Sequence, residues 1–466
     1  MENRKAIGGI VGAAVFIALV AIVPAPAGLS QGGWHLVGIL FASIVLWLTN
    51  AFPKMITTMF IIGALTIMGI YPDIGATLQQ FMSTPVLLVF GSFLLAAMFN
   101  DTDVPLRFVC FMMRFTKDSG KAFLLVIMFA VAFAAAVLAD LAGMIIFIAF
   151  VGKVLNIQKG IVTEDNLALK KALMISIPTA AFAGSLMIPI GGPNNLVIMG
   201  MFESATGIAI TFPQWVIMMF PIACICIVVL WFWLCVMIKP DRIAPEQYKT
   251  LQDEAARLGK WTPREIKAVV VLVLLIAMWF AGTWLPVFAS GTVIVIGAVI
   301  MYLPGMRLVN FETFRKEASW DLMFFLAGIM MIANANMVTG LVPWAVDVFF
   351  GWLALVNPVA MVFLSAVLII VIRVVVPAGP PVTAMAVPAL IALALGAGVN
   401  PAIIVAVGTA FGAMVFFLPL DPLKAYTFDY GQFSMPELLR VEVPAVACMV
   451  VLVCAVAPLL VSIAGL

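Results

Sequence analysis

Two long apolar segments of this chain are each broken by prolines and hydrogen-bonding residues where a hydrophobic helix would otherwise continue. The first break reads Pro-Ile-Gly-Gly-Pro-Asn-Asn over residues 189–195, and the second reads Pro-Leu-Asp-Pro-Leu-Lys over residues 419–424. Proline removes a backbone donor, and in lipid a freed backbone group is tolerated only where it lines a cavity or is buried in protein. Two broken spans in matching positions indicate the binding site of a transporter.

The composition identifies the class of protein. Hydrophobic residues make up 65% of the chain, charged residues only 10%, and the mean hydropathy is +1.22. Such a chain is a polytopic membrane protein with lipid as its surroundings, because its apolar runs exceed what a soluble core holds. The net charge of +2 argues against a nucleic-acid partner. No phosphate-binding loop, zinc-ligand spacing or nucleophile motif is present, so we expect neither an enzyme nor a bound organic cofactor.

The apolar runs predict an all-α protein of eleven spans and two re-entrant hairpins. Residues 121–153 and 357–400 are each too long for one crossing and too short for two full ones, so each is predicted to enter and leave on one side. The spans are predicted near residues 6–24, 34–51, 55–71, 85–99, 172–202, 214–238, 266–286, 289–304, 321–339, 402–428 and 438–463.

The positions of lysine and arginine support this topology. With both hairpins re-entrant, the basic residues of the loops fall on one face and the opposite loops hold none. Because basic loops remain in the cytoplasm, the N-terminus is predicted to be cytoplasmic and the C-terminus outside, in a cell (inner) membrane.

The two halves of the chain repeat each other. Gly91 matches Gly328, each about fifty residues before a hairpin tip, and the spacing of Pro213 to Pro221 equals that of Pro436 to Pro444. Inverted repeats of this kind are typical of secondary transporters. The charged segment 239–267 is predicted to join the halves as an interfacial helix. Segments 103–118 and 341–353 are predicted to be shorter interfacial helices. We divide the chain into scaffold half 1 (1–120), transport half 1 (121–240), linker with scaffold half 2 (241–355) and transport half 2 (356–466).

Several local strings carry a family resemblance over nearly the whole chain. They are Gly-Trp-His at 33–35, Asn-Ala-Phe-Pro at 50–53, Pro-Ile-Gly-Gly-Pro-Asn at 189–194 and Phe-Ser-Met-Pro-Glu at 433–437. With the predicted plan, they resemble the divalent anion/sodium symporter family, which includes dicarboxylate, citrate and sulfate transporters. The resemblance implies a Ser-Asn-Thr motif at each hairpin tip that binds sodium and substrate, and a homodimer that works by an elevator movement.

Both hairpin tips depart from that family pattern. The first tip reads Ala139-Asp140-Leu141, and the second reads Ala378-Gly379-Pro380. The second break adds Asp421 and Lys424, and Arg373 lies a few residues before the second tip. A charge at membrane depth costs about 2.5–3.5 kcal/mol, so the four ionisable residues Asp140, Arg373, Asp421 and Lys424 require an explanation.

Two explanations of these charges remain open. Asp140 and Asp421 can neutralise Arg373 and Lys424 and hold the helices together without any ligand. Alternatively, Arg373 and Lys424 stand in for the second sodium as fixed cations beside an anionic substrate. Asp140, with the oxygens of the first break, would then bind a sodium ion or a proton.

The candidate site follows from these positions. Substrate-binding residues are predicted to be Asn194, Asn195, Gly192, Arg373, Gly379, Thr383 and Lys424. Ion or proton coupling is assigned to Asp140, Ala139, Gly191 and Asp421, with Asp140 and Gly191 as the ligands of a sodium ion if one binds.

The favoured function is secondary transport of a small divalent anion, of the dicarboxylate type, by a homodimer with an elevator mechanism. Its coupling to sodium is weakened or replaced by the fixed charges of Arg373 and Lys424, which leaves proton coupling and exchange open. The alternative is a cation/proton antiporter that uses Asp140 and Asp421. A third reading is a ligand-sensing membrane receptor, which the lack of a large soluble output domain argues against.

Overall fold

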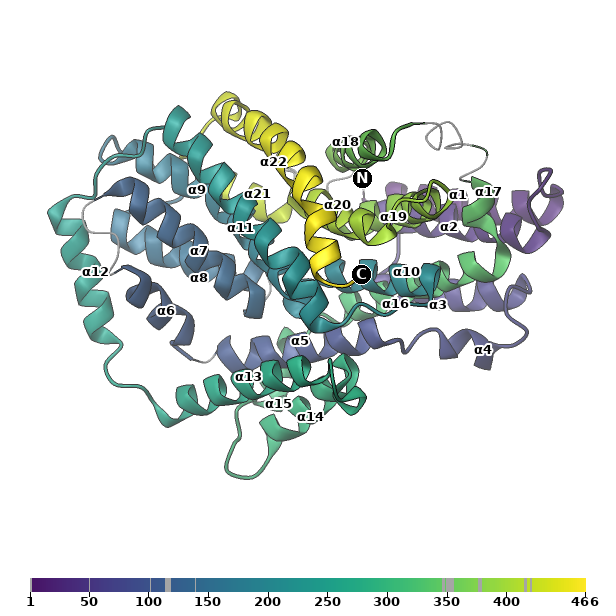
Figure 1. Cartoon of the computed structure of the whole chain (residues 1–466), viewed down its shortest axis with the longest axis horizontal. Coiled ribbons are helices and arrows are strands. Elements are labelled where there is room, and N and C mark those ends of the chain that lie inside the picture. The colour runs from purple at the N-terminus through teal and green to yellow at the C-terminus, as the bar shows by residue number, and fades with distance from the viewer. Residues whose placement is uncertain are drawn as a thin grey trace.

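The computed structural model describes the chain except at residues 1, 50, 101, 114–118, 139, 346, 347, 349–355, 376–378, 415, 416 and 420. The described residues form helices joined by short loops (Figure 1). The helices of the first half are α1 (Glu2–Ile22), α2 (Gln31–Thr49), α3 (Lys54–Ile67), α4 (Ile74–Gln79), α5 (Thr84–Asn100), α6 (Val104–Met113), α7 (Gly120–Leu138), α8 (Asp140–Leu155), α9 (Leu167–Met187), the 3-10 helix η1 (Pro189–Gly191), α10 (Pro193–Thr206) and α11 (Phe212–Met237).

The second half follows the linker helix α12 (Pro245–Arg257). Its elements are α13 (Pro263–Ala281), the 3-10 helix η2 (Pro286–Phe288), α14 (Ser290–Tyr302), α15 (Phe311–Glu317), α16 (Trp320–Thr339), α17 (Leu341–Ala345), α18 (Pro358–Val375), α19 (Gly379–Gly396), α20 (Pro401–Met414), α21 (Pro422–Phe428) and α22 (Met435–Ile463).

A helix, or a helix pair in the two broken cases, lies at each position where the sequence predicts a span. Among the described residues, four helices, α7, α9, α11 and α22, are individually long and apolar enough to cross a membrane. Each predicted hairpin consists of two helices, α7 with α8 and α18 with α19. That the hairpins are re-entrant stays a prediction. Helices α6, α12 and α17 lie in the three segments predicted to be interfacial, and their position at the interface stays a prediction. The expected continuation of α17 to residue 353 lies largely outside the described residues.

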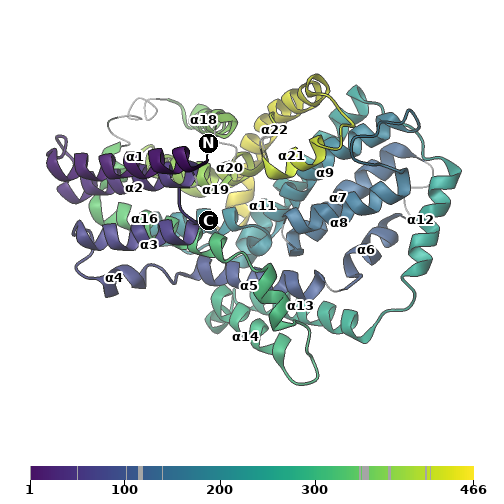
Figure 2. The ribbon, with the colours of Figure 1, turned by 180° about the vertical axis from the view of Figure 1, so that it is seen from behind.

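The internal repeat is visible in how equivalent helices begin and pack. Thr211 caps α11 and Ser434 caps α22 with the same capping box, each followed by a proline in the first turn. The two helices pack against each other in the middle of the molecule (Figures 1 and 2).

The two matching glycines also occupy equivalent contacts. A Cβ atom on Gly91 of α5 would collide with Ile294 of α14, and one on Gly328 of α16 would lie 3.1 Å from Ile61 of α3. Each half therefore packs the last span before its hairpin, α5 or α16, against the preceding span of the other half, α14 or α3. This exchange is the contact pattern that a pseudo-twofold pair of repeats produces.

Small residues allow the first hairpin to approach the first broken span closely. The contact of α7 with α9 places the backbone of Ala132 where a Cβ on Gly184 would be, and Gly143 of α8 lies against the backbone of Ala135 in α7. Small residues at helix interfaces let backbones approach in a membrane, where the hydrophobic effect does not drive helices together. In both views α7, α8 and α9 gather at one end, with α1, α2 and α3 at the other (Figures 1 and 2).

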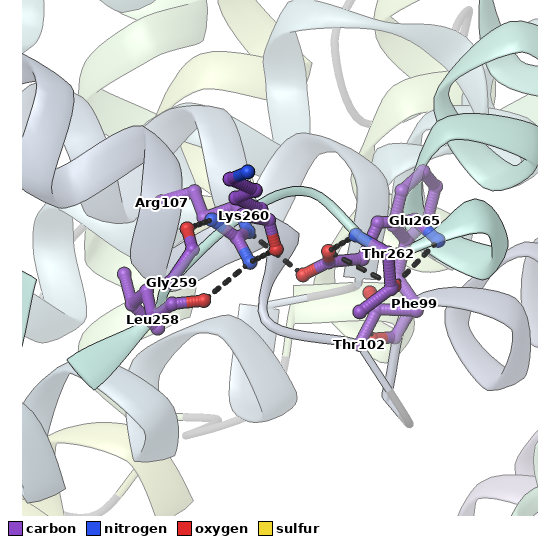
Figure 3. Close-up of polar contacts among 8 residues, drawn as sticks. All are labelled: Phe99, Thr102, Arg107, Leu258, Gly259, Lys260, Thr262 and Glu265. Atoms are coloured by element: carbon purple, nitrogen blue, oxygen red, sulfur yellow. Dashed lines mark hydrogen bonds and ion pairs between the residues drawn. The ribbon is translucent and has the colours of Figure 1, made fainter. Parts of the chain in front are cut away.

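Arg107 of α6 fixes the linker that joins the halves (Figure 3). Its guanidinium donates to Glu265 Oε1 at 2.8 Å and to the carbonyl oxygens of Leu258 and Gly259 at 2.6 and 2.8 Å. Glu265 also completes the N-terminal capping box of α13 with Thr262. Both groups are nearly buried, so this charge-assisted network anchors the end of the linker to the first half.

Candidate functional site

The first break is held open by side chains that bond the freed carbonyl groups. Ile188 and Gly192 are extended on either side of η1, so the helical hydrogen bonds of α9 stop at this point. Asn195 Nδ2 donates to the carbonyl oxygens of Ser185 at 2.6 Å and of Ile188 at 3.0 Å. Asn195 is fully buried, and the hydrogen bonds of its side-chain nitrogen to these carbonyl groups maintain the break. Its Oδ1 has no partner among the described residues.

The glycines of the first break allow close packing of the backbone. A Cβ atom on Gly191 would collide with the backbone of Ser185, and one on Gly192 would lie 3.3 Å from the Ser185 hydroxyl oxygen. Both residues are therefore needed for the shape of the break itself. Whether their oxygens also bind an ion stays a prediction.

Asn194 connects the first break to the second hairpin. Its Oδ1 accepts a hydrogen bond of 2.6 Å from Thr383 Oγ1 in α19. Gly412 of α20 packs against both of these side chains. A Cβ atom on Gly412 would be 2.7 Å from Thr383 Cγ2 and 3.9 Å from Asn194 Nδ2. Within the described part of the chain Asn194 Nδ2 is a buried donor without an acceptor. A buried, unpaired donor of this kind is a place for a ligand oxygen.

Two helix N-termini meet at this junction. Asn194 lies in the first turn of α10, which begins at Pro193, and Thr383 lies in the first turns of α19, which begins at Gly379. Helix N-termini carry partial positive charge and unbonded N–H groups, so they favour anions. The hydrogen bond between Asn194 and Thr383 therefore places the first turn of α10 against α19 one turn after the start of that helix.

Arg373 and Asp421 form a buried ion pair beside the second break. Arg373 Nη2 lies 2.7 Å from Asp421 Oδ2, and their side chains are 2% and 7% exposed. Asp421 Oδ1 also accepts from the backbone N–H of Leu423 at 3.0 Å and so caps α21. Of the predicted internal pairings, this one is present, and it ties α18 of the second hairpin to the second break.

Lys424 is paired with a carboxylate that the sequence reasoning missed. Its Nζ lies 2.8 Å from Glu442 Oε1, and both side chains are fully buried. The same ammonium donates to Ile175 O at 2.7 Å and to Thr179 Oγ1 at 3.3 Å. The predicted partners of Lys424 were Asp140 and Asp421, and neither holds this position. A glutamate inside the last predicted span was the available signal, since such residues are costly there.

Asp140 begins α8 directly after Ala139, which lies outside the described residues. Asp140 Oδ1 accepts from the backbone N–H of Leu141 at 2.8 Å. The side chain is also close enough to Asp421 for the two charges to repel. No cluster of three or more metal-binding side chains occurs among the described residues, so any cation here would depend on backbone and amide oxygens as well.

Among the described residues, the charges around the second break are the buried cations Arg373 and Lys424, the buried carboxylates Asp421 and Glu442, and the partly exposed carboxylate of Asp140. Arg373 is matched by Asp421 and Lys424 by Glu442, which leaves Asp140 without a basic partner in either ion pair. The cluster thus has one surplus negative charge when every group is ionised. Such a charge at membrane depth calls for a proton or a bound cation.

Known proteins resemble this chain along its length. The family described as the sodium:sulfate symporter transmembrane region matches residues 5–459. Sodium-dependent dicarboxylate transporter SdcS of Staphylococcus saprophyticus is 21% identical over 457 residues, which cover 93% of this chain and 87% of SdcS. A membrane protein of Cupriavidus necator is 23% identical over 362 residues, covering 72% of this chain and 68% of that protein.

A solved structure has the same fold. The match to the crystal structure of the Alcanivorax borkumensis YdaH transporter covers 99% of this chain and 98% of the YdaH chain, with a TM-score of 0.55 and 12% sequence identity. That identity is low, so the likeness concerns the fold alone. The family match extends over nearly all of the chain, and the all-helical architecture with two broken helices agrees with it. The chain is a multi-pass membrane protein that belongs to the divalent anion/sodium symporter family of transporters.

Proposed function

We propose that this protein carries a small divalent anion of the dicarboxylate type across the membrane, and that the anion binds where Asn194 meets Thr383. The observation that carries the proposal is Asn194 Nδ2, a buried donor with no acceptor among the described residues, set between the N-termini of α10 and α19. A carboxylate supplies the missing acceptor, and two helix N-termini favour its charge. The relative SdcS is described as a sodium-dependent dicarboxylate transporter, which agrees with this substrate class.

The backbone of both breaks completes the proposed substrate site. Gly192 precedes α10 and Gly379 begins α19, and because Pro193, Pro380 and Pro381 carry no N–H, the backbone donors of these first turns are limited to Asn194 in α10 and to Gly379 and Val382 in α19. We assign substrate contact to Asn194, Thr383 and these two N-termini. Asn195 is assigned the maintenance of the first break, because its amide nitrogen is bonded to the carbonyl groups of that break.

Coupling is assigned to the surplus carboxylate. A dianion approaching this cluster is repelled unless Asp140 is first neutralised, because Arg373 and Lys424 already face carboxylates of their own. A sodium ion shared by Asp140 and the backbone of Gly191, or a proton on Asp140, removes that repulsion. Cation uptake thereby raises the affinity for the anion, which is the basis of symport.

Arg373 and Lys424 are assigned indirect roles. Arg373 holds Asp421 at the start of α21, and Lys424 holds α21 against α9 and α22 through Ile175 and Glu442. Arg373 thus fixes the second break next to the hairpin, as a bound sodium ion does in the family, and Lys424 fixes it to α9 and α22. We further propose a homodimer in the inner membrane with a cytoplasmic N-terminus, an outer C-terminus and an elevator movement of residues 121–240 and 356–466.

The test is uptake of radiolabelled succinate, citrate and sulfate into proteoliposomes, with sodium present or replaced by potassium, and with or without a pH gradient. Asn194→Ala is expected to raise KM at least tenfold and, because it also removes the acceptor of the Thr383 hydroxyl, to lower the melting temperature less than the loss of both carbonyl bonds of Asn195 does. Asn195→Ala is the neighbouring control and is expected to lower the melting temperature, because it frees two buried carbonyl groups. Uptake by Asn194→Ala with wild-type KM would remove this residue from the site.

One observation favours a second function, cation/proton antiport with no organic substrate. The surplus negative charge at Asp140 and Asp421 is what an antiporter needs to bind its ions in turn. The discriminating measurement is sodium-driven proton release from proteoliposomes, followed with a pH-sensitive dye in the absence of any dianion. Proton movement without an added anion supports the antiporter, and proton movement only with a dicarboxylate supports coupled anion transport.

A further inference from the structure

A large apolar cavity separates the second hairpin from the first helices of the chain. Its volume is about 450 Å³, and it lies between α1, α2, α10, α16, α17 and α19. Trp34 and Trp47 of α2 line one side, Ile329 of α16 lines a second, and Pro388 and Ala389 of α19 line a third. The volume falls within the range of about 300–1,000 Å³ that ligand sites occupy.

The chemistry of the lining selects an apolar occupant. The lining is apolar except for two buried polar atoms that have no partner among the described residues, Asn336 Oδ1 and Trp47 Nε1. A buried water needs two to four polar partners, and a cavity lined by apolar side chains stays dry or takes an apolar ligand. A water-soluble anion has no positive group to meet here. The cavity is therefore distinct from the proposed substrate site.

The cavity is bounded by residues on the outer surface of the protein. Leu19 of α1 and Phe41 of α2 both line it, and they are 44% and 45% exposed. The rings of Phe16 and Phe41 stack with centroids 5.5 Å apart at this edge. In a multi-pass protein, apolar side chains exposed on apolar helices face lipid. An occupant therefore reaches the cavity from the bilayer.

From this geometry we propose that the cavity binds an acyl chain of a membrane lipid, inserted between α1 and α2 on one side and α19 on the other. The chain fills a space that no described side chain fills, and it contacts the middle of the helix whose first turns carry Thr383. Packing contacts of this kind replace the dispersion energy that an empty space forfeits. The lipid is thus a structural ligand of the second hairpin.

The experiment is photolabelling of the purified protein in phosphatidylcholine vesicles whose lipid carries a diazirine in its acyl chain, with labelled residues located by mass spectrometry. We expect labelling of Ile329 or Ala333 on α16 and of Pro388 or Ala389 on α19, the inner walls of the cavity. Labelling of the exposed residues Val451 and Leu459 of α22 serves as the internal standard for ordinary lipid contact.

Two variants test whether the label arises inside the cavity. Ala333→Phe and Ala389→Phe place a ring into it from opposite walls, and each is expected to reduce labelling of the facing wall at least fivefold with no change on α22. Labelling confined to α22 and the other exposed faces of the wild type overturns the proposal, whether or not the variants fold. The label needs no transport, so its outcome is independent of the uptake assays of the proposed function.

Discussion

The buried pair of Arg373 and Asp421 predicts a large and strongly non-additive effect of mutation. Arg373→Met leaves a carboxylate that is 7% exposed without its cation, and Asp421→Asn leaves a guanidinium that is 2% exposed without its anion. Removing one partner of a buried pair costs about 3–5 kcal/mol of folding free energy, because the remaining charge is uncompensated. Asparagine keeps the side-chain acceptor that caps α21, so the second variant tests charge alone.

The double variant Arg373→Met with Asp421→Asn removes both charges together. Replacing a buried pair by neutral groups of similar volume is often neutral, so we expect it to be more stable than either single variant, with a coupling energy of at least about 2 kcal/mol. The assay is unfolding of the protein in detergent by increasing denaturant, with uptake measured on the same preparations. Additive single effects would show that the two side chains act independently and would refute the pairing. Recovery of stability with no recovery of uptake would assign Arg373 to the substrate as well.

Three further predictions follow from the same contacts. Lys424→Met is expected to destabilise the fold by about 3–5 kcal/mol, because its buried partner on α22 loses its cation, whereas Lys171→Met breaks a pair whose side chains are 23% and 28% exposed and costs about 0–1 kcal/mol in the same unfolding assay. Gly184→Ala is expected to cost on the order of 1–3 kcal/mol by clashing with the backbone of α7, while Gly63→Ala, which faces open space, leaves the melting temperature unchanged. Asp140→Asn is expected to make uptake independent of both sodium and pH, and retained dependence would remove Asp140 from coupling.

The sequence allowed the helical framework to be predicted because its signals are local. Proline and glycine at 189–193 end one helix and begin the next by their own backbone geometry, and the structure has the break at that place. The spans follow from the length of apolar runs, and the repeat follows from spacing, as in the shared capping boxes of α11 and α22. These features need no knowledge of which helices touch.

The charge pairs could not be predicted because they depend on packing between distant segments. Asp421 and Arg373 are 48 residues apart, and the alternatives Asp140 and Lys424 were equally compatible with a shared membrane depth. The partner of Lys424 is Glu442, which lies inside the last predicted span, 438–463. Only the approach of α22 to α21 and α9 selects this carboxylate. Asn194 and Thr383 are likewise 189 residues apart, and neither sequence position indicates the other.

These pairings change how a chain without Ser-Asn-Thr tips can attract a dianion. A fixed cation offsets a substrate charge only if no carboxylate lies closer, and both Arg373 and Lys424 have one at hydrogen-bond distance. We therefore propose that the attraction comes from helix N-termini and amide donors, together with the cation or proton that neutralises Asp140. A mobile cation or a proton can do so in one conformation and leave in the other, which a side-chain cation cannot. On the proposed function, a chain without the tip motifs keeps ion coupling through the single carboxylate of Asp140.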